Sequence, residues 1–326
     1  MPVISVVCPV FNESGCLDEL YRRLTATLLE ICESHELILV DDGSSDGSWE
    51  IIAALSARDS RVHGIRFSRN FGHHLSISAG LDYTRGDWVV VMDSDLQDLP
   101  ESIPELYARA TEGFDIVLAC RSIRRDSWFK RTTSHLFHKI YAFFTDTVYD
   151  AQQGVFRIMS RRVVGVLRQM REHNRNFGVL VDWAGFRRSR IFVEHAARYA
   201  GKTKYTLAKQ IDLALHTILS VSDRPLMYAM YMGLCMTAFA VLFCAFLVAI
   251  AIAGRSGISG YGTLAAAIFF VGGLTIFTVG MVGIYVGRIL TQVQGRPLYV
   301  VAETSGYDSD VPVAFEDATR SLSTAE

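Results

Sequence analysis

The chain has few cysteines and no motif that pairs them. Its 326 residues include six cysteines, and no two of them form a Cys-x-x-Cys pair. Disulfide frameworks occur in small, cysteine-dense secreted domains, and zinc sites commonly use such pairs. The sequence therefore argues against both and indicates reduced thiols facing the cytosol.

A basic excess and a secretion signal are also missing. The formal net charge is −2 and the isoelectric point is about 6.5, whereas nucleic-acid-binding domains are usually basic. The N-terminal stretch MPVISVVCPVFNE has neither the basic region nor the long apolar run of a signal peptide. We expect no nucleic-acid partner, and we expect a folded domain from the start of the chain.

The two common phosphate-binding loops are absent as well. No Gly-x-Gly-x-x-Gly follows the first strand-like run, and no Gly-x-x-x-x-Gly-Lys-Ser/Thr occurs anywhere in the chain. An anionic ligand would need another counter-charge.

Residues 1–120 do contain a regular alternation of apolar runs and helical patterns, which predicts an α/β fold with a mainly parallel sheet and helices on both faces. The expected strands are Ile4–Val10, Leu37–Val40, Val62–Phe67, Val89–Met92 and Ile116–Cys120. The expected helices are Leu17–Ile31, Trp49–Ala57, His74–Tyr83 and Ile103–Thr111. Ligands of such sheets bind beyond the carboxyl ends of the strands.

The fourth apolar run ends in carboxylates, in the stretch VVVMDSDLQD. Because unpaired buried charge is costly, these acids should lie where the strand emerges from the core. Asp93 and Asp95 suit a divalent cation that also binds substrate phosphates, and Gln97 is placed to add an oxygen. Asp98 has capping-box spacing to Glu101, which favours a helix cap.

Two long uncharged segments follow, at 226–253 and 263–287. About 20 helical residues cross a bilayer core, so both are long enough. The short Gly/Ser-rich stretch between them predicts a transmembrane hairpin. Arg224, Arg288 and Arg296 flank it, against Arg255 alone in the turn, so the positive-inside rule places both ends in the cytoplasm.

The domain organisation follows from these segments. We expect a cytosolic catalytic domain at 1–205, an amphipathic interfacial helix at 206–225, two transmembrane helices within 226–290, and a C-terminal segment at 291–326. Residues from about 304 onward are polar and acidic, and we expect them to form a mobile tail.

Five motifs together resemble a known family. They are PVFNE (9–13), VDDGSSDGS (40–48), SRNFG (68–72), AGLDYTRGD (79–87) and MDSDLQDLPE (92–101). In this order they are similar to family 2 glycosyltransferases of the polyprenyl-phosphate type, which include bacterial undecaprenyl-phosphate sugar transferases and dolichol-phosphate mannose synthases. The later segments FRIMSRR, HAARYAGKTKY and GRPLYVV extend the resemblance to about residue 301.

The resemblance implies a GT-A fold, the nucleotide-sugar-binding α/β type. It implies a donor site formed by Pro9, Phe11, Glu13, Asp42, Asp93 and Ser94, in which Asp42 accepts a hydrogen bond from the base. It also implies that Mg²⁺ or Mn²⁺ is held by Asp93, Asp95 and Gln97. His73, His74 and the loop at Phe177 are candidates for the sugar pocket.

For the acceptor, the resemblance implies a lipid phosphate bound by Arg121, Arg131, Ser134, Arg157, Arg198 and Lys204. The expected catalytic residues are Asp93, Asp95, Arg121, Arg131 and Asp182. Two departures from the family stand out. Val155 replaces a carboxylate that many bacterial relatives carry, and Ile284 replaces a glutamate in the second apolar segment.

The expected function is that of an inverting, metal-dependent hexosyltransferase in the bacterial inner membrane. It would move a hexose to undecaprenyl phosphate on the cytosolic leaflet, and the similarity to bacterial sugar transferases favours UDP as the carrier of that hexose. The sequence leaves the sugar and the oligomeric state open.

Other functions compete with this one. A membrane-anchored receiver-like signalling module would use Asp41 and Asp42 for Mg²⁺ and Asp93 as phosphoacceptor. A haloacid-type phosphotransferase would place its Asp-x-Asp pair after the first strand, not the fourth. A processive polysaccharide synthase would carry a Gln-x-x-Arg-Trp motif, which this chain lacks.

Overall fold

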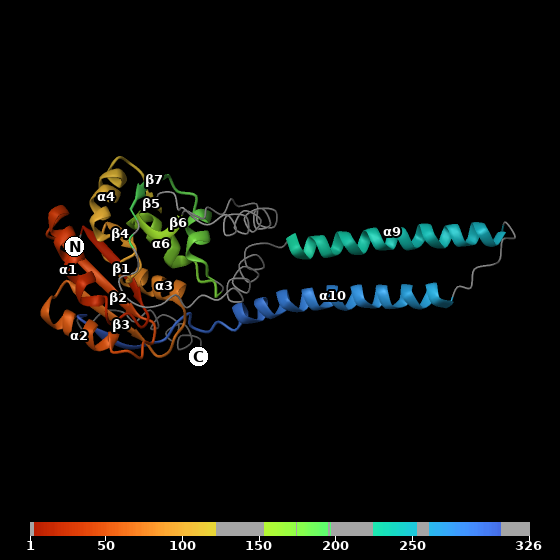
Figure 1. Ribbon diagram of the computed structural model, residues 1–326, viewed down its shortest axis with the longest axis horizontal. Coiled ribbons are helices and arrows are strands. Elements are labelled where there is room, and N and C mark those ends of the chain that lie inside the picture. Colours follow the sequence, from red (N-terminus) through yellow and green to blue (C-terminus); the bar gives the residue numbers. More distant parts are fainter. Residues whose placement is uncertain are drawn as a thin grey trace, which may run out of the picture. The chain divides into compact units, whose positions relative to one another are not determined.

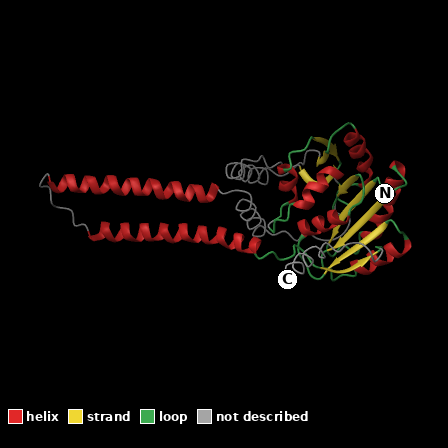
Figure 2. Ribbon diagram, turned by 180° about the vertical axis from the view of Figure 1, so that it is seen from behind, coloured by secondary structure: helices red, strands yellow, loops and turns green. Residues whose placement is uncertain are grey.

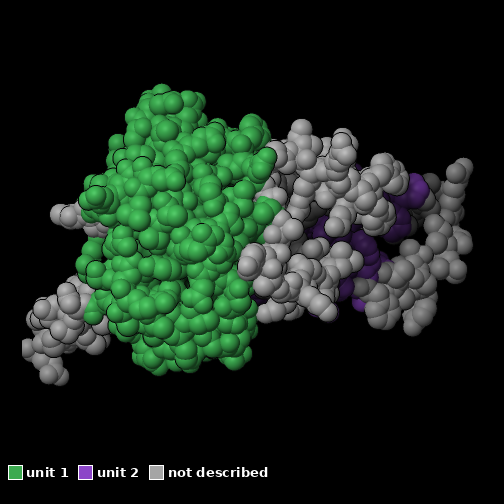
Figure 3. Space-filling model, turned by 60° about the vertical axis from the view of Figure 1, so that its left-hand side comes forward, with its two compact units in different colours: residues 1–127, 150–204, 297–326 green, residues 128–149, 205–296 purple. Residues whose placement is uncertain are grey.

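The computed structural model describes residues 3–121, 153–173, 175–194, 196, 224–252 and 261–307. The chain forms two compact units (Figure 3). The first, called here the catalytic unit, comprises Met1–Ser127, Asp150–Lys204 and Pro297–Glu326. The second comprises Trp128–Tyr149 and Tyr205–Arg296.

The described part of the catalytic unit contains one mixed sheet in the order β7-β5-β6-β4-β1-β2-β3-β8 (Figure 1). Neighbouring strands are parallel, except that β6 is antiparallel to β4 and β5, and β8 is antiparallel to β3. The strands are β1 (Ile4–Val10), β2 (His35–Asp41), β3 (Val62–Phe67), β4 (Trp88–Val91), β5 (Ile116–Arg121), β6 (Gln153–Ser160), β7 (Arg188–Val193) and β8 (Val301–Ser305).

Helices cover both faces of this sheet, which Figure 2 shows as yellow strands between red helices. One face packs against α1 (Leu17–Ile31), α2 (Ser48–Arg58) and α4 (Ile103–Thr111), the last preceded by the short 3-10 helix η1 (Pro100–Ser102). The other face packs against α3 (His73–Tyr83), α6 (Arg161–Gln169) and α7 (Phe177–Trp183). The expected α/β architecture is confirmed.

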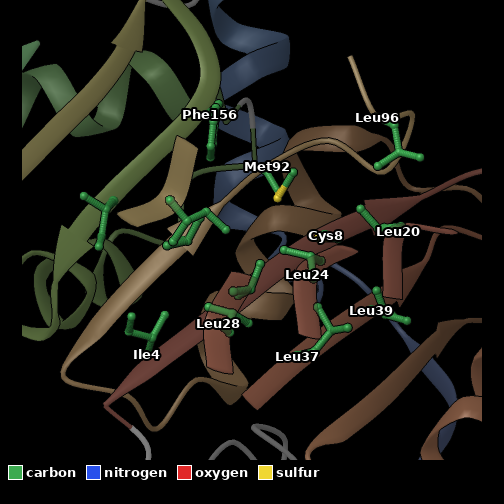
Figure 4. Packing of buried hydrophobic residues seen from close by; sticks show 14 of the residues in the cluster. Ile4, Cys8, Leu20, Leu24, Leu28, Leu37, Leu39, Met92, Leu96 and Phe156 are labelled. Atoms are coloured by element: carbon green, nitrogen blue, oxygen red, sulfur yellow. The ribbon is translucent and has the colours of Figure 1, made fainter. Parts of the chain in front are cut away.

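The α1 face shows why the sequence pattern forms this core. Leu20, Leu24 and Leu28 recur at helical spacing and lie over Leu37 and Leu39 of β2 (Figure 4). All five side chains are buried, and burying a side chain of this size contributes about 1.5–3 kcal/mol.

The expected elements of residues 1–120 match the observed ones closely. The bounds of β1, β3, α1 and α4 are the predicted ones, and the other elements shift by one or two residues. The N-cap residue of η1 is Leu99, one residue after the predicted cap Asp98. Asp98 itself is buried.

The C-terminal strand β8 extends beyond the point where we expected the tail to begin, because β8 runs to Ser305. Glu303 accepts hydrogen bonds from Trp49 Nε1 at 2.8 Å and from Arg66 Nη1 at 3.2 Å. Beyond the strand, the Tyr307 ring stacks on His63, with centroids 4.5 Å apart. These long-range contacts hold a segment that looks polar and tail-like in the sequence.

The second unit contains two long helices, α9 (Arg224–Ile252) and α10 (Tyr261–Val293). By length and hydropathy, one helix in the described part of the chain can cross a membrane, at Phe270–Val293 with a mean hydropathy of 1.8. A shorter apolar stretch lies at Leu226–Ala240. The second crossing therefore stays a prediction, and the expected interfacial helix at 206–225 lies outside the described residues.

Tyr299 fixes the segment that leads into β8, and this contact generates a prediction. Its hydroxyl donates to Asp82 Oδ2 at 2.7 Å, and its ring stacks on Phe67. Burial and the nearby Asp82 raise the pKa of Tyr299 far above its usual value, so the hydroxyl remains a donor. Tyr299→Phe should destabilise the catalytic unit by about 1–3 kcal/mol, because it leaves the carboxylate without one donor.

Thermal unfolding of the full chain in detergent measures this effect. Tyr107→Phe is the matched control, because the Tyr107 hydroxyl makes no hydrogen bond within the described residues. Equal melting temperatures for the two variants would contradict the assigned role of Tyr299.

Candidate active site

The carboxyl ends of β1, β2, β3, β4, β5 and β7 share one edge of the sheet, because these strands all run in the same direction. The predicted polar motifs follow four of these ends, at 11–16, 42–47, 68–72 and 92–99. The structure therefore brings PVFNE, DDGSSDGS, SRNFG and DSDLQD to a single edge.

The loops after β1 and β2 are tied together by hydrogen bonds between them. Asn12 N donates to Ser44 Oγ at 2.9 Å, and Ser45 N donates to Asn12 Oδ1 at 2.8 Å. Ser14 N donates to Asp46 Oδ2 at 2.9 Å. Asn12 has φ 55°, a left-handed conformation that Asn tolerates better than most residues. Sequence reasoning did not identify Asn12 or Ser44.

Three of the predicted donor residues lie at the end of β1 and in the loop that follows it. Pro9 is buried in β1, opposite Val40 of β2. The Phe11 side chain is 40% exposed at the strand end. Glu13 N donates to Ser48 Oγ at 3.2 Å, and Glu13 Oε2 accepts a hydrogen bond from Cys16 Sγ at 3.7 Å. Phe11 thus offers an open aromatic surface beside a fixed backbone.

Asp42 accepts hydrogen bonds from the loop after β3, a role that the sequence did not predict. Its Oδ1 accepts from Phe71 N at 2.6 Å, and its Oδ2 accepts from Gly72 N at 3.0 Å. Burial raises the pKa of Asp42, while these amide hydrogen bonds oppose the shift. Asp42 thereby fixes the start of α3, and a carboxylate oxygen that accepts one hydrogen bond still has a lone pair for a ligand.

Asp93 and Asp95 lie in a tight turn after β4. Asp95 is 7% exposed, and its Oδ1 accepts from Gln97 N at 3.1 Å. Leu96, between Asp95 and Gln97, has φ 59°, which a non-glycine residue rarely adopts. Asp93 Oδ1 lies 3.5 Å from His73 Nε2. Ser94 is buried in the same turn.

These residues fit a divalent cation shared with a ligand. No group of three or more His, Cys, Asp or Glu side chains in the described residues forms a self-sufficient metal site. Magnesium sites often use only one or two carboxylates together with substrate phosphates, and Asp93 and Asp95 supply two. The Gln97 main-chain oxygen accepts from Ala196 N at 3.0 Å, which ties this turn to the segment after β7.

The predicted acceptor residues are placed less completely. Arg121 ends β5 at the same edge of the sheet. Arg131, Ser134, Arg198 and Lys204 lie outside the described residues. Arg157 is buried in β6 and donates to the main-chain oxygens of Val155 and Gly154, at 3.1 and 2.8 Å. Asp182 Oδ1 accepts from Arg188 Nη1 at 2.7 Å.

Comparison with known proteins identifies the family. The model of the family described as "Glycosyl transferase family 2" matches residues 5–168. The chain belongs to glycosyl transferase family 2. This membership argues against the receiver-like and haloacid-type alternatives. The fold is of the GT-A type, as expected.

Three relatives of this glycosyltransferase are similar over nearly their whole length. An uncharacterized glycosyltransferase, YkcC of Bacillus subtilis (strain 168), is 36% identical over 94% of this chain and 95% of its own. An undecaprenyl-phosphate 4-deoxy-4-formamido-L-arabinose transferase of Shewanella sediminis (strain HAW-EB3) is 34% identical over 92% of each. A prophage bactoprenol glucosyl transferase homolog of Escherichia coli (strain K12) is 35% identical over 91% and 98%.

Gly43 provides a test of how the loops of this glycosyltransferase pack. It has φ +71°, and an added Cβ would lie 2.7 Å from the main-chain carbon of Arg69. Gly43→Ala should therefore push the SRNFG loop away and destabilise the protein by about 3 kcal/mol, the sum of a left-handed conformation and overpacking.

Gly47→Ala is the matched control, because Gly47 also has positive φ but its added Cβ would meet only Glu50 Oε2, at 3.9 Å. It should cost about 1 kcal/mol, for the backbone conformation alone. Thermal unfolding in detergent compares the two variants. A smaller loss for Gly43→Ala than for Gly47→Ala would contradict this packing.

Proposed function

We propose that this glycosyltransferase moves a hexose from a UDP-linked donor to undecaprenyl phosphate on the cytosolic leaflet of the bacterial inner membrane. The observation that carries the proposal is the placement of Asp93 and Asp95 at the sheet edge shared by the two tied loops, in a chain that continues into the apolar helices α9 and α10. The names of two relatives, which refer to undecaprenyl phosphate and bactoprenol, support this choice of acceptor.

For the donor, we assign the nucleoside to the loops after β1 and β2. Phe11 has the exposed ring that a base or ribose needs for packing, and Asp42 has lone pairs for a base N–H. We also assign Pro9, near the end of β1, and Glu13, in the loop after it, to the nucleoside, and Ser94 to the diphosphate. The fixed hydrogen bonds of these loops support a preformed pocket.

For the metal, we assign Asp93, Asp95 and Gln97 as ligands of Mg²⁺ or Mn²⁺. Such an ion, when bound, neutralises charge on the leaving diphosphate. The protein's own contribution is to hold both carboxylates in one turn and to orient Asp95 through Gln97 N.

For the acceptor, we assign Arg121, Arg131, Ser134, Arg198 and Lys204 to the lipid phosphate, because arginine forks suit phosphate oxygens. A phosphate monoester has a second pKa near 6, so the nucleophile is largely dianionic at neutral pH. The reaction then needs no general base, consistent with Val155. We assign Asp182 to an ion pair with Arg188, which its hydrogen bond to that residue supports.

The proposed reaction is a single displacement at the anomeric carbon. A lipid phosphate oxygen forms the new bond to that carbon, and the bond from the same carbon to the nucleoside diphosphate breaks. The anomeric configuration inverts because the nucleophile attacks opposite the leaving group.

The membrane assignment rests on the second unit. Ile276 and Val293 of α10 are each 76% exposed, and Phe239 of α9 is 70% exposed. Exposed apolar surface of this extent marks an interaction with lipid or protein. We assign α9 and α10 to a transmembrane hairpin whose two ends lie in the cytoplasm.

A transfer assay tests the proposed chemistry. Purified protein in detergent receives undecaprenyl phosphate, Mn²⁺ or Mg²⁺ and radiolabelled UDP-glucose, UDP-galactose, UDP-N-acetylglucosamine or GDP-mannose, and organic-phase label is counted. One donor should give labelled lipid, EDTA should abolish it, and Asp95→Asn should lower kcat by about 10²–10³, because loss of transition-state charge stabilisation costs this much.

Asp87→Asn is the control, because Asp87 lies just before β4, at the opposite end of that strand, and is exposed. It should retain wild-type activity. Full activity of Asp95→Asn would disprove the metal assignment. Hydrolysis of a donor without any labelled lipid would disprove the acceptor assignment.

The topology has its own test in whole cells. A cysteine introduced by Ser256→Cys, between the two apolar helices, should react with a membrane-impermeant maleimide added outside the inner membrane, because a hairpin places this stretch there. Native Cys16, in the catalytic unit, should react only after permeabilisation and denaturation. Labelling of Ser256→Cys only after permeabilisation would contradict the hairpin.

A further inference from the structure

Four side chains from three elements gather beside Asp93, on the α3 face of the sheet. His73 and His74 form the first turn of α3, and their ring centroids are 5.6 Å apart. Arg157 of β6 lies with its guanidinium carbon 5.0 Å from the centroid of Phe177, the first residue of α7.

The strand register places this cluster next to the Asp-x-Asp turn. Arg157 pairs with Val91, two residues before Asp93. Val91 lies in the buried cluster on the α3 face of the sheet, and Asp93 follows the end of β4 by two residues. From α3, His73 Nε2 lies 3.5 Å from Asp93 Oδ1, so this helix also contacts the Asp-x-Asp turn.

The cluster contains two buried polar atoms that no group in the described part of the chain satisfies. Arg157 is 3% exposed; its Nε and Nη2 donate to main-chain oxygens, whereas its Nη1 has no hydrogen-bond partner within the described ranges. The buried Nδ1 of His74 also has none there. Buried polar atoms are almost always paired with protein, water or ligand, so two such atoms together indicate something that binds them.

The two groups differ in charge. Burial lowers the pKa of Arg157 to about 10, so the guanidinium stays charged at neutral pH. Burial, with electrostatic contributions from His73 and Arg157, lowers the pKa of His74 to about 4, so its imidazole is neutral. Asp182 attracts the Arg157 charge, but its own hydrogen bond goes to Arg188.

This pairing suits sugar hydroxyls better than a phosphate. Phosphate recognition by arginine commonly uses two parallel N–H groups, and the Arg157 fork is already occupied at Nε and Nη2 by Val155 and Gly154. Nη1, with its two N–H groups, and the neutral Nδ1 of His74 remain without a partner in the described residues. A hydroxyl both donates and accepts, so two neighbouring hydroxyls satisfy both atoms.

We propose that Arg157 Nη1 and His74 Nδ1 form the polar floor of the sugar pocket and hydrogen-bond two hydroxyls of the transferred hexose. This inference rests on the proposed function and makes it more specific. It moves Arg157 from the lipid phosphate, where the sequence resemblance had put it, to the donor sugar. The sugar follows directly from the diphosphate at Asp93, which places its hydroxyls beside this cluster.

Two substitutions at His74 separate a polar role from a packing role. His74→Leu fills the space without a polar atom. His74→Asn places an amide near the position of Nδ1, at the same number of bonds from the backbone. Arg157 is not substituted, because two of its nitrogens also hold the β6 backbone.

Calorimetric titration with Mn²⁺ compares UDP with UDP-glucose, UDP-galactose and UDP-N-acetylglucosamine on each protein. For the nucleotide sugar that wild type binds best, His74→Leu should raise the Kd about tenfold, the usual effect of one hydrogen bond to a buried group. The Kd for UDP should stay unchanged, and His74→Asn should recover most of the loss. His35→Leu controls for loss of a histidine elsewhere, since His35 Nδ1 contacts only its own turn at Cys32.

Deoxy analogues of the same nucleotide sugar identify the hydroxyl. Wild type should lose affinity for the analogue lacking it, whereas His74→Leu should bind that analogue and the parent sugar equally. An unchanged Kd in His74→Leu, or equal losses for UDP and the nucleotide sugar, would overturn the inference. Failure of the proposed function shows separately, as absence of labelled lipid from wild type, since these titrations need no acceptor.

Discussion

Carboxylates that accept hydrogen bonds from backbone amides hold the active-site edge together. Asp42 accepts from Phe71 and Gly72, Asp46 accepts from Ser14, and Asp95 accepts from Gln97. Loops at the ends of parallel strands have no ladder of their own to satisfy their amides. Each acid supplies the missing acceptor, so these residues give the crevice its shape as well as its negative charge.

Through Asp42, this constraint extends to the residues that we propose for the sugar pocket. Asp42 fixes Phe71 and Gly72, and α3 begins at the next residue with His73 and His74. The helix therefore places His73 Nε2 3.5 Å from Asp93 Oδ1. Asp42 thus links the loop after β2, through the loop after β3 and the start of α3, to the Asp-x-Asp turn.

Much of this arrangement could be predicted from the sequence, because the deciding signals are local. β1, β3, α1 and α4 follow from apolar periodicity, and Asp93 and Asp95 stand out as acids after a buried run. The antiparallel strands β6 and β8 could not be placed, because their partners β4 and β3 are distant in sequence. The burial of Arg157 depends on the same long-range pairing, and no local pattern tells a buried arginine from an exposed one. The hydrogen bonds of Asp42 to Phe71 and Gly72, and those of Asn12 to Ser44 and Ser45, could not be predicted for the same reason, because the partners are distant in sequence.

The strand β8 has a consequence for the order in which the protein is made. The chain leaves the sheet after β7, forms α9 and α10, and returns as β8, so the sheet's two outer strands flank the apolar helices in sequence. Translation therefore completes both helices before it supplies β8. Until then β3 is an open edge, with unpaired amides of the kind that promote association between chains. β8 covers that edge when it pairs with β3. The sheet is therefore completed only after both apolar helices have left the ribosome.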